Sequence, residues 1–268
     1  MEVSIIIINW NTKELVLSCV ESVYKSISKL SFEVIVVDNG SQDGSVEALK
    51  KLRFKNLKII SNEKNLGFAK ANNIGITIAK GKYILLLNSD TEVKKRVIDK
   101  MVEFGKGKDD VGVVGAKLLN KDGSLQESVF NLPTLERAIR QYWFGQKGLL
   151  DKLSPKGEQP VEVEAVVGAA LLITPRARKE VGILSEKYFM YFEDLDYCRR
   201  VRKAGMKVYF LPSAEIYHYH GASGRKIINN GEQWRRLVPS SKAYHGAIQH
   251  YLIWYVMWTG QKFGKLMK

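Results

Sequence analysis

The stretch EVIVVDNGS, residues 33–41, decides the fold. Its first part, Glu33 to Val37, is apolar after the opening glutamate, and an apolar run without alternation predicts a strand covered on both faces of a sheet. The run ends abruptly in Asp38-Asn39-Gly40-Ser41, a composition typical of a turn. This pattern, a buried strand that ends at an acidic turn, serves as the template for predicting the other strands of the chain.

The same unit recurs through the first 110 residues. Besides 33–37, apolar runs predict strands over 3–8, 57–60 and 83–87. Helices are predicted between them, over 13–26, 44–52 and 68–79. Strands and helices that alternate at this spacing predict βαβ units, and hence an α/β fold with a mostly parallel central sheet flanked by helices.

The pattern loosens after residue 110. Strands are expected over 111–118, 161–174 and 206–211, and a helix over 194–203. We therefore expect one domain over 1–230, made of the halves 1–110 and 111–230. A helical, basic and aromatic tail is expected to follow it over 231–268.

Composition narrows the class of protein. The chain has 268 residues, of which 45% are hydrophobic and 26% charged, and this excludes a disordered or collagen-like protein. Cys19 and Cys198 are too few for a disulfide framework or a cysteine-based zinc site, which favours a reducing compartment. The first strand lacks a basic leader, and no apolar run approaches the roughly 20 residues of a spanning helix. A cytoplasmic location is therefore expected.

Charge is the unusual feature of the composition. The chain has 42 basic and 28 acidic residues, a net charge of +14, which predicts an anionic partner such as nucleic acid, anionic lipid or a phosphorylated substrate. Half of this surplus falls in the last 44 residues, whose one acid is Glu232. Their basic residues are Arg225, Lys226, Arg235, Arg236, Lys242, Lys262, Lys265 and Lys268.

Two predicted strands end at an acid, at Asp38 and at Asp90. In open α/β sheets ligands bind beyond the carboxyl ends of the strands, where an aspartate can accept from a base or ribose or hold a metal ion. Each acid alone is also explained as a turn former or helix cap. The pair favours a functional site, and the absence of GxGxxG and GxxxxGK[ST] motifs argues against a dinucleotide dehydrogenase or a P-loop NTPase.

Four segments in order resemble family 2 glycosyltransferases, and within them the rhamnosyltransferase-like branch. They are VVDNGSQDGS at 36–45, NLGFAKANNIGI at 65–76, GKYILLLNSDT at 81–91 and YFEDLDYCRRVRKAG at 191–205. The resemblance covers residues 3–224 and implies a GT-A fold. It also implies transfer of a sugar from a nucleoside-diphosphate donor with inversion at the anomeric carbon. On this basis 1–110 is the nucleotide-sugar-binding half and 111–230 the acceptor and catalytic half.

The resemblance also implies the residues that bind the donor. They are Asp38, Asn39, Gly67, Asn72, Asn73, Asn88, Ser89, Asp90 and Arg200. Among them Asp38 falls where the family contacts the nucleotide base. The family's Asp-x-Asp metal motif reads Asn88-Ser89-Asp90 here, so one carboxylate is missing. A Mg²⁺ or Mn²⁺ cofactor is expected to depend on Asp90 and on a further ligand.

The acidic cluster at 193–196 opens the predicted helix over 194–203. Acids are favoured in a first helical turn, and Asp196 and Arg200 have the spacing of an i,i+4 ion pair. That explanation suffices for Glu193 and Asp196. Sugar transfer needs a base for the acceptor hydroxyl, and Asp194 matches the catalytic aspartate of the family's Glu-Asp motif.

Two late histidines compete for the missing metal ligand. His218 and His220 are two residues apart and point the same way if the segment is extended, and imidazole suits Mn²⁺-like ions. His218 matches the family's late histidine motif and is the preferred ligand, with His220 as the competitor.

The tail carries Ala247, Tyr251, Trp254 and Trp258 at helical spacing among basic residues. Tryptophan and tyrosine beside lysine suit the headgroup level of an anionic membrane. A helix packed on its own domain, or on a second copy in a homodimer, is the alternative. Nucleic acid is not expected as a partner, because no RNP, zinc-finger or helix-turn-helix pattern accompanies the aromatic residues.

We expect an inverting, metal-dependent hexosyltransferase at the inner face of the cell membrane. Its donor is expected to be dTDP-rhamnose and its acceptor a lipid-linked or polysaccharide substrate of cell-envelope glycan synthesis. The basic, aromatic segment 133–150 fits an acceptor-side wall or an ordinary packed helix. Alternatives for the whole chain are a GT-A-like nucleotidyltransferase, or a non-catalytic protein that binds membrane or nucleic acid.

Overall fold

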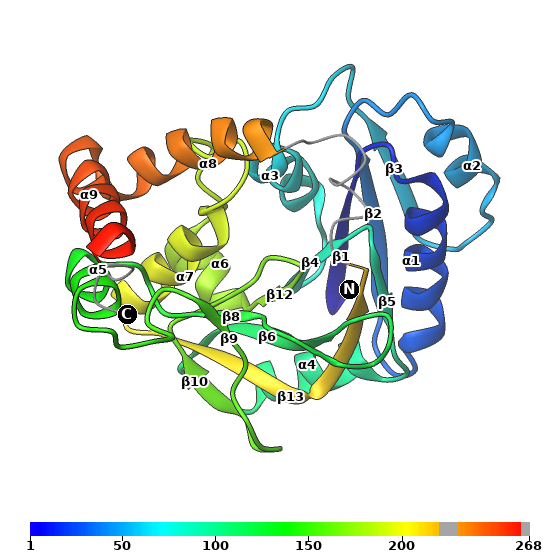
Figure 1. Cartoon of the computed structure of the whole chain (residues 1–268). Coiled ribbons are helices and arrows are strands. Elements are labelled where there is room, and N and C mark those ends of the chain that lie inside the picture. The colour runs from blue at the N-terminus through cyan, green and yellow to red at the C-terminus, as the bar shows by residue number, and fades with distance from the viewer. Residues whose placement is uncertain (220–229, 264–268) are drawn as a thin grey trace.

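A computed structural model describes residues 1–219 and 230–263 of the chain (Figure 1). The first half contains four neighbouring parallel strands in the order β4-β1-β2-β3. They are β1 (Val3–Asn9), β2 (Phe32–Asp38), β3 (Leu57–Ser61) and β4 (Tyr83–Asn88). The connecting helices are α1 (Lys13–Ser26), α2 (Ser45–Lys51) and α3 (Phe68–Ile78). The prediction of βαβ units is confirmed.

The second half continues the same sheet in the order β10-β13-β6-β12 up to β4. Its strands in this sheet are β6 (Val111–Leu119), β7 (Leu125–Gln126), β10 (Val161–Val163), β12 (Ala170–Ile173) and β13 (Lys207–His218). The short strand β5 (Thr91–Val93) of the first half pairs with β13. A second, small sheet is formed by β8 (Val129–Phe130), β9 (Lys152–Leu153) and β11 (Ala165–Val166). The helices are α4 (Val97–Lys106), α5 (Leu135–Tyr142), α6 (Pro175–Val181), α7 (Glu193–Lys203), α8 (Asn230–His245) and α9 (Ala247–Phe263).

Both faces of the central sheet are buried. Residues of α1 and α4 pack with the side of β1 that carries Val3, Ile5 and Ile7. Residues of α3, α6 and α7 form the other core layer with Ile6. Because each strand is covered on both sides, its sequence is apolar throughout instead of alternating.

The expected single strand over 161–174 is wrong. The chain there forms β10 in the main sheet, β11 in the small sheet and β12 in the main sheet again. Glu164 forms an ion pair with Arg137 at 2.6 Å, and the backbone N–H of Gly168 donates to Asp194 instead of to a neighbouring strand. These side-chain contacts divide an apolar run that periodicity alone reads as continuous.

The strand expected over 206–211 is longer, since β13 continues to His218. Leu211 pairs with Ala116 of β6, and the next pairing is Glu215 with Lys117. Residues 212–214 therefore form a bulge, where Pro212 needs no ladder hydrogen bond. The bulge lets β13 pass an unfavourable residue and reach β5, where His218 pairs with Thr91.

The C-terminal helices form a separate layer at the edge of the molecule that lies opposite α1 and α2 (Figure 1). Helix α8 runs from the neighbourhood of α3 toward α9, and α9 packs against α5. Segment 133–150 thus contains a helix packed on the tail. Within residues 1–219 and 230–263, no helix combines the length and apolar character needed to cross a bilayer.

Candidate active site

A continuous network of buried polar side chains joins the carboxyl ends of the first-half strands. Asp38, at the end of β2, is fully buried and accepts from Asn9 Nδ2 at 2.7 Å and from the backbone N–H of Ser41 at 2.9 Å. Thr12 Oγ1 donates to Asn9 Oδ1 at 2.7 Å and lies 3.0 Å from Ser89 Oγ. The two predicted strand-end sites are therefore parts of one rigid edge.

Asn39 and Gly67 belong to a second part of this edge. Asn39 Nδ2 donates to Asn65 Oδ1 at 2.9 Å and to the Gly67 carbonyl at 3.3 Å. Gly67 has a φ of +86°, and a Cβ atom there would collide with the Phe189 carbonyl oxygen. That oxygen accepts from the backbone N–H of Phe68 at 2.7 Å. Glycine is required because the start of α3 lies directly on the loop that precedes α7.

The asparagines of α3 are buried and bonded inside the protein. Asn72 Nδ2 donates to the Phe68 carbonyl at 2.9 Å. Asn73 Nδ2 donates to the Leu184 carbonyl at 2.9 Å, and its Oδ1 accepts from the Leu184 N–H at 3.0 Å. Asn73 thus ties α3 to the segment before α7.

Asp90 and His218 are brought together although they are far apart in the sequence. His218 Nε2 lies 3.3 Å from Asp90 Oδ1 and 3.3 Å from Asn88 Nδ2. His218 Nδ1 lies 2.6 Å from Gln126 Oε1. Nδ1–H donates to the Gln126 oxygen. The other ring nitrogen, Nε2, therefore faces Asp90 and Asn88. His220 lies outside the residues that the structure describes.

This pair suits a divalent cation. A carboxylate and an imidazole are ligand types that Mn²⁺ accepts, and a metal-binding histidine commonly donates its other N–H to a carbonyl oxygen, as His218 does to Gln126. Across the described part of the chain, no group of three or more His, Cys, Asp or Glu side chains is placed to hold a metal ion. Asp90 and His218 fit a site whose further ligands come from elsewhere, such as the donor's phosphates or water.

Asp194 lies in the first turn of α7 and faces the sheet. Its Oδ2 accepts from the Gly168 N–H at 3.0 Å and its Oδ1 from the Leu195 N–H at 2.8 Å. The neighbouring Ala169 carbonyl accepts from the Asn88 N–H at 2.9 Å. The turn at 168–169 therefore connects Asp194 directly to the end of β4.

Burial raises the pKa of Asp194 above its ordinary value, although two backbone N–H groups and the Lys152 charge oppose the shift. The adjacent Glu193 is 6% exposed, and its Oε2 has no hydrogen-bond partner among the described residues. Burial and the neighbouring Asp194 carboxylate hold the pKa of Glu193 well above its ordinary value. A raised pKa suits a carboxylate that takes up a proton during a reaction.

Arg200 is bound to protein groups. Its guanidinium donates to Asp196 Oδ2 and to the carbonyls of Val181 and Ile183, each at 2.9 Å. The expected i,i+4 ion pair between Asp196 and Arg200 is confirmed. In this structure the arginine fixes α7 to the segment that follows α6.

One residue near the site was missed by the sequence analysis. The Arg236 guanidinium, on α8, lies 6.0 Å from the centre of the Trp10 ring and 5.4 Å from that of Phe189. Trp10 directly follows β1, and Phe189 touches Gly67. A cation therefore lies beside the end of β1. The abundance of basic residues in the tail was the available signal, but it did not single out this arginine.

Solved structures that share this arrangement are glycosyltransferases of the GT-A fold. A structure of GalNAc-T7 with UDP, GalNAc and Mn²⁺ matches with a TM-score of 0.62 and 18% identity, over 81% of this chain and 44% of that one. Residues 1–349 of TarS from S. aureus match with a TM-score of 0.59 and 18% identity, over 96% and 69%. The chain has a GT-A fold. A sequence model of glycosyl transferase family 2 matches residues 4–152, more than half of the chain, and the chain belongs to that family.

Curated relatives place it near the rhamnosyltransferases of this family. The low-salt glycan biosynthesis hexosyltransferase Agl10 of Haloferax volcanii is 27% identical over 212 residues, which are 77% of this chain and 64% of the relative. The N-acetylglucosaminyl-diphospho-decaprenol L-rhamnosyltransferase of Mycobacterium tuberculosis is 29% identical, over 71% and 67%. The dTDP-rhamnosyl transferase RfbF of Shigella flexneri is 23% identical, over 72% and 62%. The chain thus spans about two thirds of the length of these relatives.

Proposed function

We propose that the protein transfers a hexose, with rhamnose from its dTDP donor as the first candidate, to a lipid-linked or polysaccharide acceptor with inversion. The observation that carries the proposal is the direct connection of Asp194 to the end of β4 through Gly168 and Ala169. The connection holds a carboxylate of raised pKa beside the Asn88-Ser89-Asp90 turn, where the family binds the donor's diphosphate. The names of the relatives support this choice of donor and acceptor.

In this proposal Asp194 is the general base. The two N–H groups on its oxygens hold its orientation, so that it accepts the proton of the acceptor hydroxyl as that oxygen attacks the anomeric carbon from the face opposite the diphosphate. Attack from that face inverts the anomeric centre. The raised pKa increases the driving force for proton uptake.

Donor binding is proposed at the strand-end edge. Asp38 and Asn39 shape the turn beside the nucleotide, Gly67 with Asn72 and Asn73 form the back of its pocket, and Arg200 positions the segment after α6. Asp90 and His218 would hold Mg²⁺ or Mn²⁺, with Asn88 and Ser89 in the same turn. When bound, the ion would supply positive charge beside the phosphates of the donor.

The test combines a donor panel with one variant. The chain is titrated with UDP-, dTDP- and GDP-sugars, with and without Mn²⁺, and we expect metal-dependent binding and slow hydrolysis of one donor class. Asp194→Asn is expected to keep donor affinity and lose about 1000-fold in transfer, the usual range for general-base loss. Asp122→Asn, in the exposed turn before Ser124, is the matched control.

The proposal is wrong if Asp194→Asn transfers sugar at the control's rate. It is equally wrong if no donor binds in the presence of the ion. Transfer of a nucleotidyl group instead of a sugar would assign the site to a nucleotidyltransferase.

A further inference from the structure

The outer face of α9 is apolar and exposed. The aromatic residues predicted at helical spacing, Tyr251, Trp254 and Trp258, form a row on one face of the helix, and each is about half exposed. Ile248 is 80% exposed, so this face points away from the protein. Tyr255 extends the row, and the rings of Trp254 and Trp258 stack with centres 6.2 Å apart. The opposite face carries Ile253 and Val256, which are buried with Ala138 of α5. The helix thus packs against α5 and α8 on the inside and has an unusually apolar surface on the outside.

A second segment, distant in sequence, extends this surface. Trp143 and Phe144 follow α5 and are 49% and 71% exposed. Trp143 Nε1 donates to Thr259 Oγ1 at 3.1 Å, and Thr259 stands one helical turn after Tyr255. The Trp143 ring therefore lies beside the aromatic row, because residues four apart lie on the same side of a helix. We call these six exposed aromatic residues the outer face: Trp143, Phe144, Tyr251, Trp254, Tyr255 and Trp258.

Lysines border the outer face, and residues 235–263 contain no acid. Lys242 Nζ lies 4.6 Å from the centre of the Tyr251 ring, and Lys262 Nζ lies 5.2 Å from that of Trp258. Aromatic rings with long cationic side chains at their margin match the boundary between acyl chains and anionic headgroups. If two copies of the protein paired through this face, their lysines would lie close together and repel each other, which argues against a dimer.

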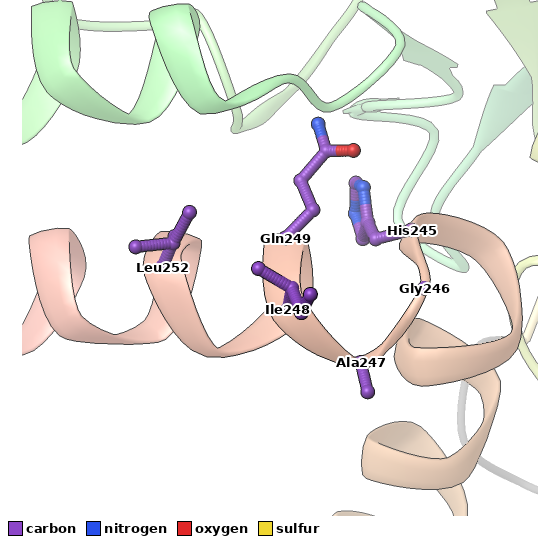
Figure 2. Close-up of a pocket in the computed structure, with 6 residues that line it drawn as sticks. All are labelled: His245, Gly246, Ala247, Ile248, Gln249 and Leu252. Carbon is purple, nitrogen blue, oxygen red and sulfur yellow. The ribbon is translucent and has the colours of Figure 1, made fainter.

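An open hollow of about 470 Å³ lies at the bend between α8 and α9 (Figure 2). It is lined by His245, Gly246, Ala247, Ile248, Gln249 and Leu252. In Figure 2 the side chains of Gln249 and His245 point toward the α5 ribbon, and that of Ala247 points away from it. Leu252 is 46% exposed, so the hollow offers aliphatic surface next to the aromatic row.

We propose that the outer face, with Lys242 and Lys262, docks the protein on an anionic lipid bilayer, with α9 lying in the plane of the interface. The exposed rings enter the headgroup region, and the lysines remain at the level of the phosphates. The apolar surface supplies part of the affinity, and the charges make the binding selective for anionic lipid. This inference concerns a surface apart from the proposed catalytic groups and does not depend on their roles.

The full-length chain is tested by co-sedimentation with phosphatidylcholine vesicles, with and without phosphatidylglycerol. We expect binding to the anionic vesicles alone, weakened by salt. Lys242→Ala and Lys262→Ala are each expected to reduce partitioning about fivefold, and Trp254→Ser with Trp258→Ser to abolish it.

Lys50→Ala with Lys51→Ala, on α2 at the opposite edge of the molecule, is the matched control and should bind like the wild type. Substitution is preferable to removing α9, which would expose the α5 surface that Ile253 and Val256 cover.

Each other outcome has a definite meaning. Equal binding to both kinds of vesicle, or an equal loss in the α2 control, overturns the proposal. The proposal is also overturned if the wild-type chain binds no vesicles but forms a dimer or binds single-stranded DNA, and if the double variant Trp254→Ser with Trp258→Ser disrupts that dimer or that DNA binding. Donor titration with Mn²⁺ is run on every variant and should be unchanged, so that failure of vesicle binding leaves the proposed sugar transfer standing.

Discussion

Glu193 and Asp194 are consecutive carboxyl groups in different surroundings. Asp194 is oriented by two backbone N–H groups, whereas Oε2 of Glu193 has no hydrogen-bond partner in the described structure. Both residues line a small cavity with Phe68 and Leu171. The pKa of Glu193 is held well above its ordinary value by burial and by Asp194. Burial and the adjacent carboxylate thus favour the protonated form of Glu193 more than in an ordinary glutamate.

This arrangement predicts a pH dependence of stability. The folded-state pKa of Glu193 lies above its unfolded value, so its contribution to stability is fully present below about pH 4.5 and is lost as pH rises through the folded pKa. In that window the free energy of unfolding should fall by up to about 1.4 kcal/mol per pH unit. Glu193→Gln, which cannot ionise, should lack this slope in urea unfolding measured from pH 5 to 8.

Glu14→Gln, at an exposed position of α1, is the control and should retain the wild-type slope. Identical pH profiles for Glu193→Gln and the wild type would show that Glu193 is ionised in the folded protein, contrary to our assignment.

At the scale of elements, α8 links the proposed donor cleft with the C-terminal layer. Ser240 Oγ donates to the Met190 carbonyl at 2.8 Å, and Arg236 lies over Trp10 and Phe189. We propose that this guanidinium contacts the diphosphate of the donor. Arg236→Ala should weaken donor binding about tenfold, equivalent to about 1.4 kcal/mol for one charge-assisted hydrogen bond.

The neighbouring Arg235 provides a matched control, because it is exposed on the same helix. Calorimetric titration of both variants with dTDP and Mn²⁺ should separate a local contact from the general positive charge of α8. Equal affinities of the two variants would remove Arg236 from the site.

Single elements were predicted from sequence where hydrophobic contacts alone determine them. The helix over 13–26 and the strand ending at Asp38 match the structure because their apolar pattern and turn residues agree. The interpretation failed at 161–174, where Glu164 and Gly168 take partners from distant segments. Such side-chain contacts leave no periodic signal in the local sequence.

At the scale of the whole molecule, the proposed metal site unites β4 and β13. If Asp90 and His218 hold the ion, Mn²⁺ together with dTDP should raise the melting temperature, because a ligand that binds the folded state stabilises it by about 2.7 kcal/mol at about 100 times its Kd. Chelation with EDTA should remove the metal-dependent part of that increase. Asp90→Asn and His218→Ala should lack it.

His250→Ala, on α9 where His250 contacts Ser241, is the control and should keep the full metal response. A Mn²⁺-dependent increase of wild-type size in both site variants would mean that the ion, if bound, uses other ligands.

The sequence allowed the strand-end acids to be predicted, since Asp38 directly follows an apolar run and Asp90 lies three residues after one. It did not allow Arg236 to be placed beside Trp10, or Trp143 beside α9, because those contacts depend on how α8 and α9 return across the fold. The position of these acids at the sheet edge was therefore predictable from the sequence, whereas the groups that α8 brings beside them were not, and the roles of the acids stay predictions.

The bulge at 212–214 divides β13 into two segments with separate tasks. Residues up to Leu211 belong to the core, and the segment from Glu215 adds Ile216 to the core and carries His218 to its place beside Asp90. Because residues 212–214 pair with no residue of β6, an insertion or deletion there can be absorbed without moving either segment. Related chains could thus differ in length at this point and still superpose both in the core and at Asp90 and His218. A gap at 212–214 in an alignment is therefore no evidence that the proposed metal site has been lost.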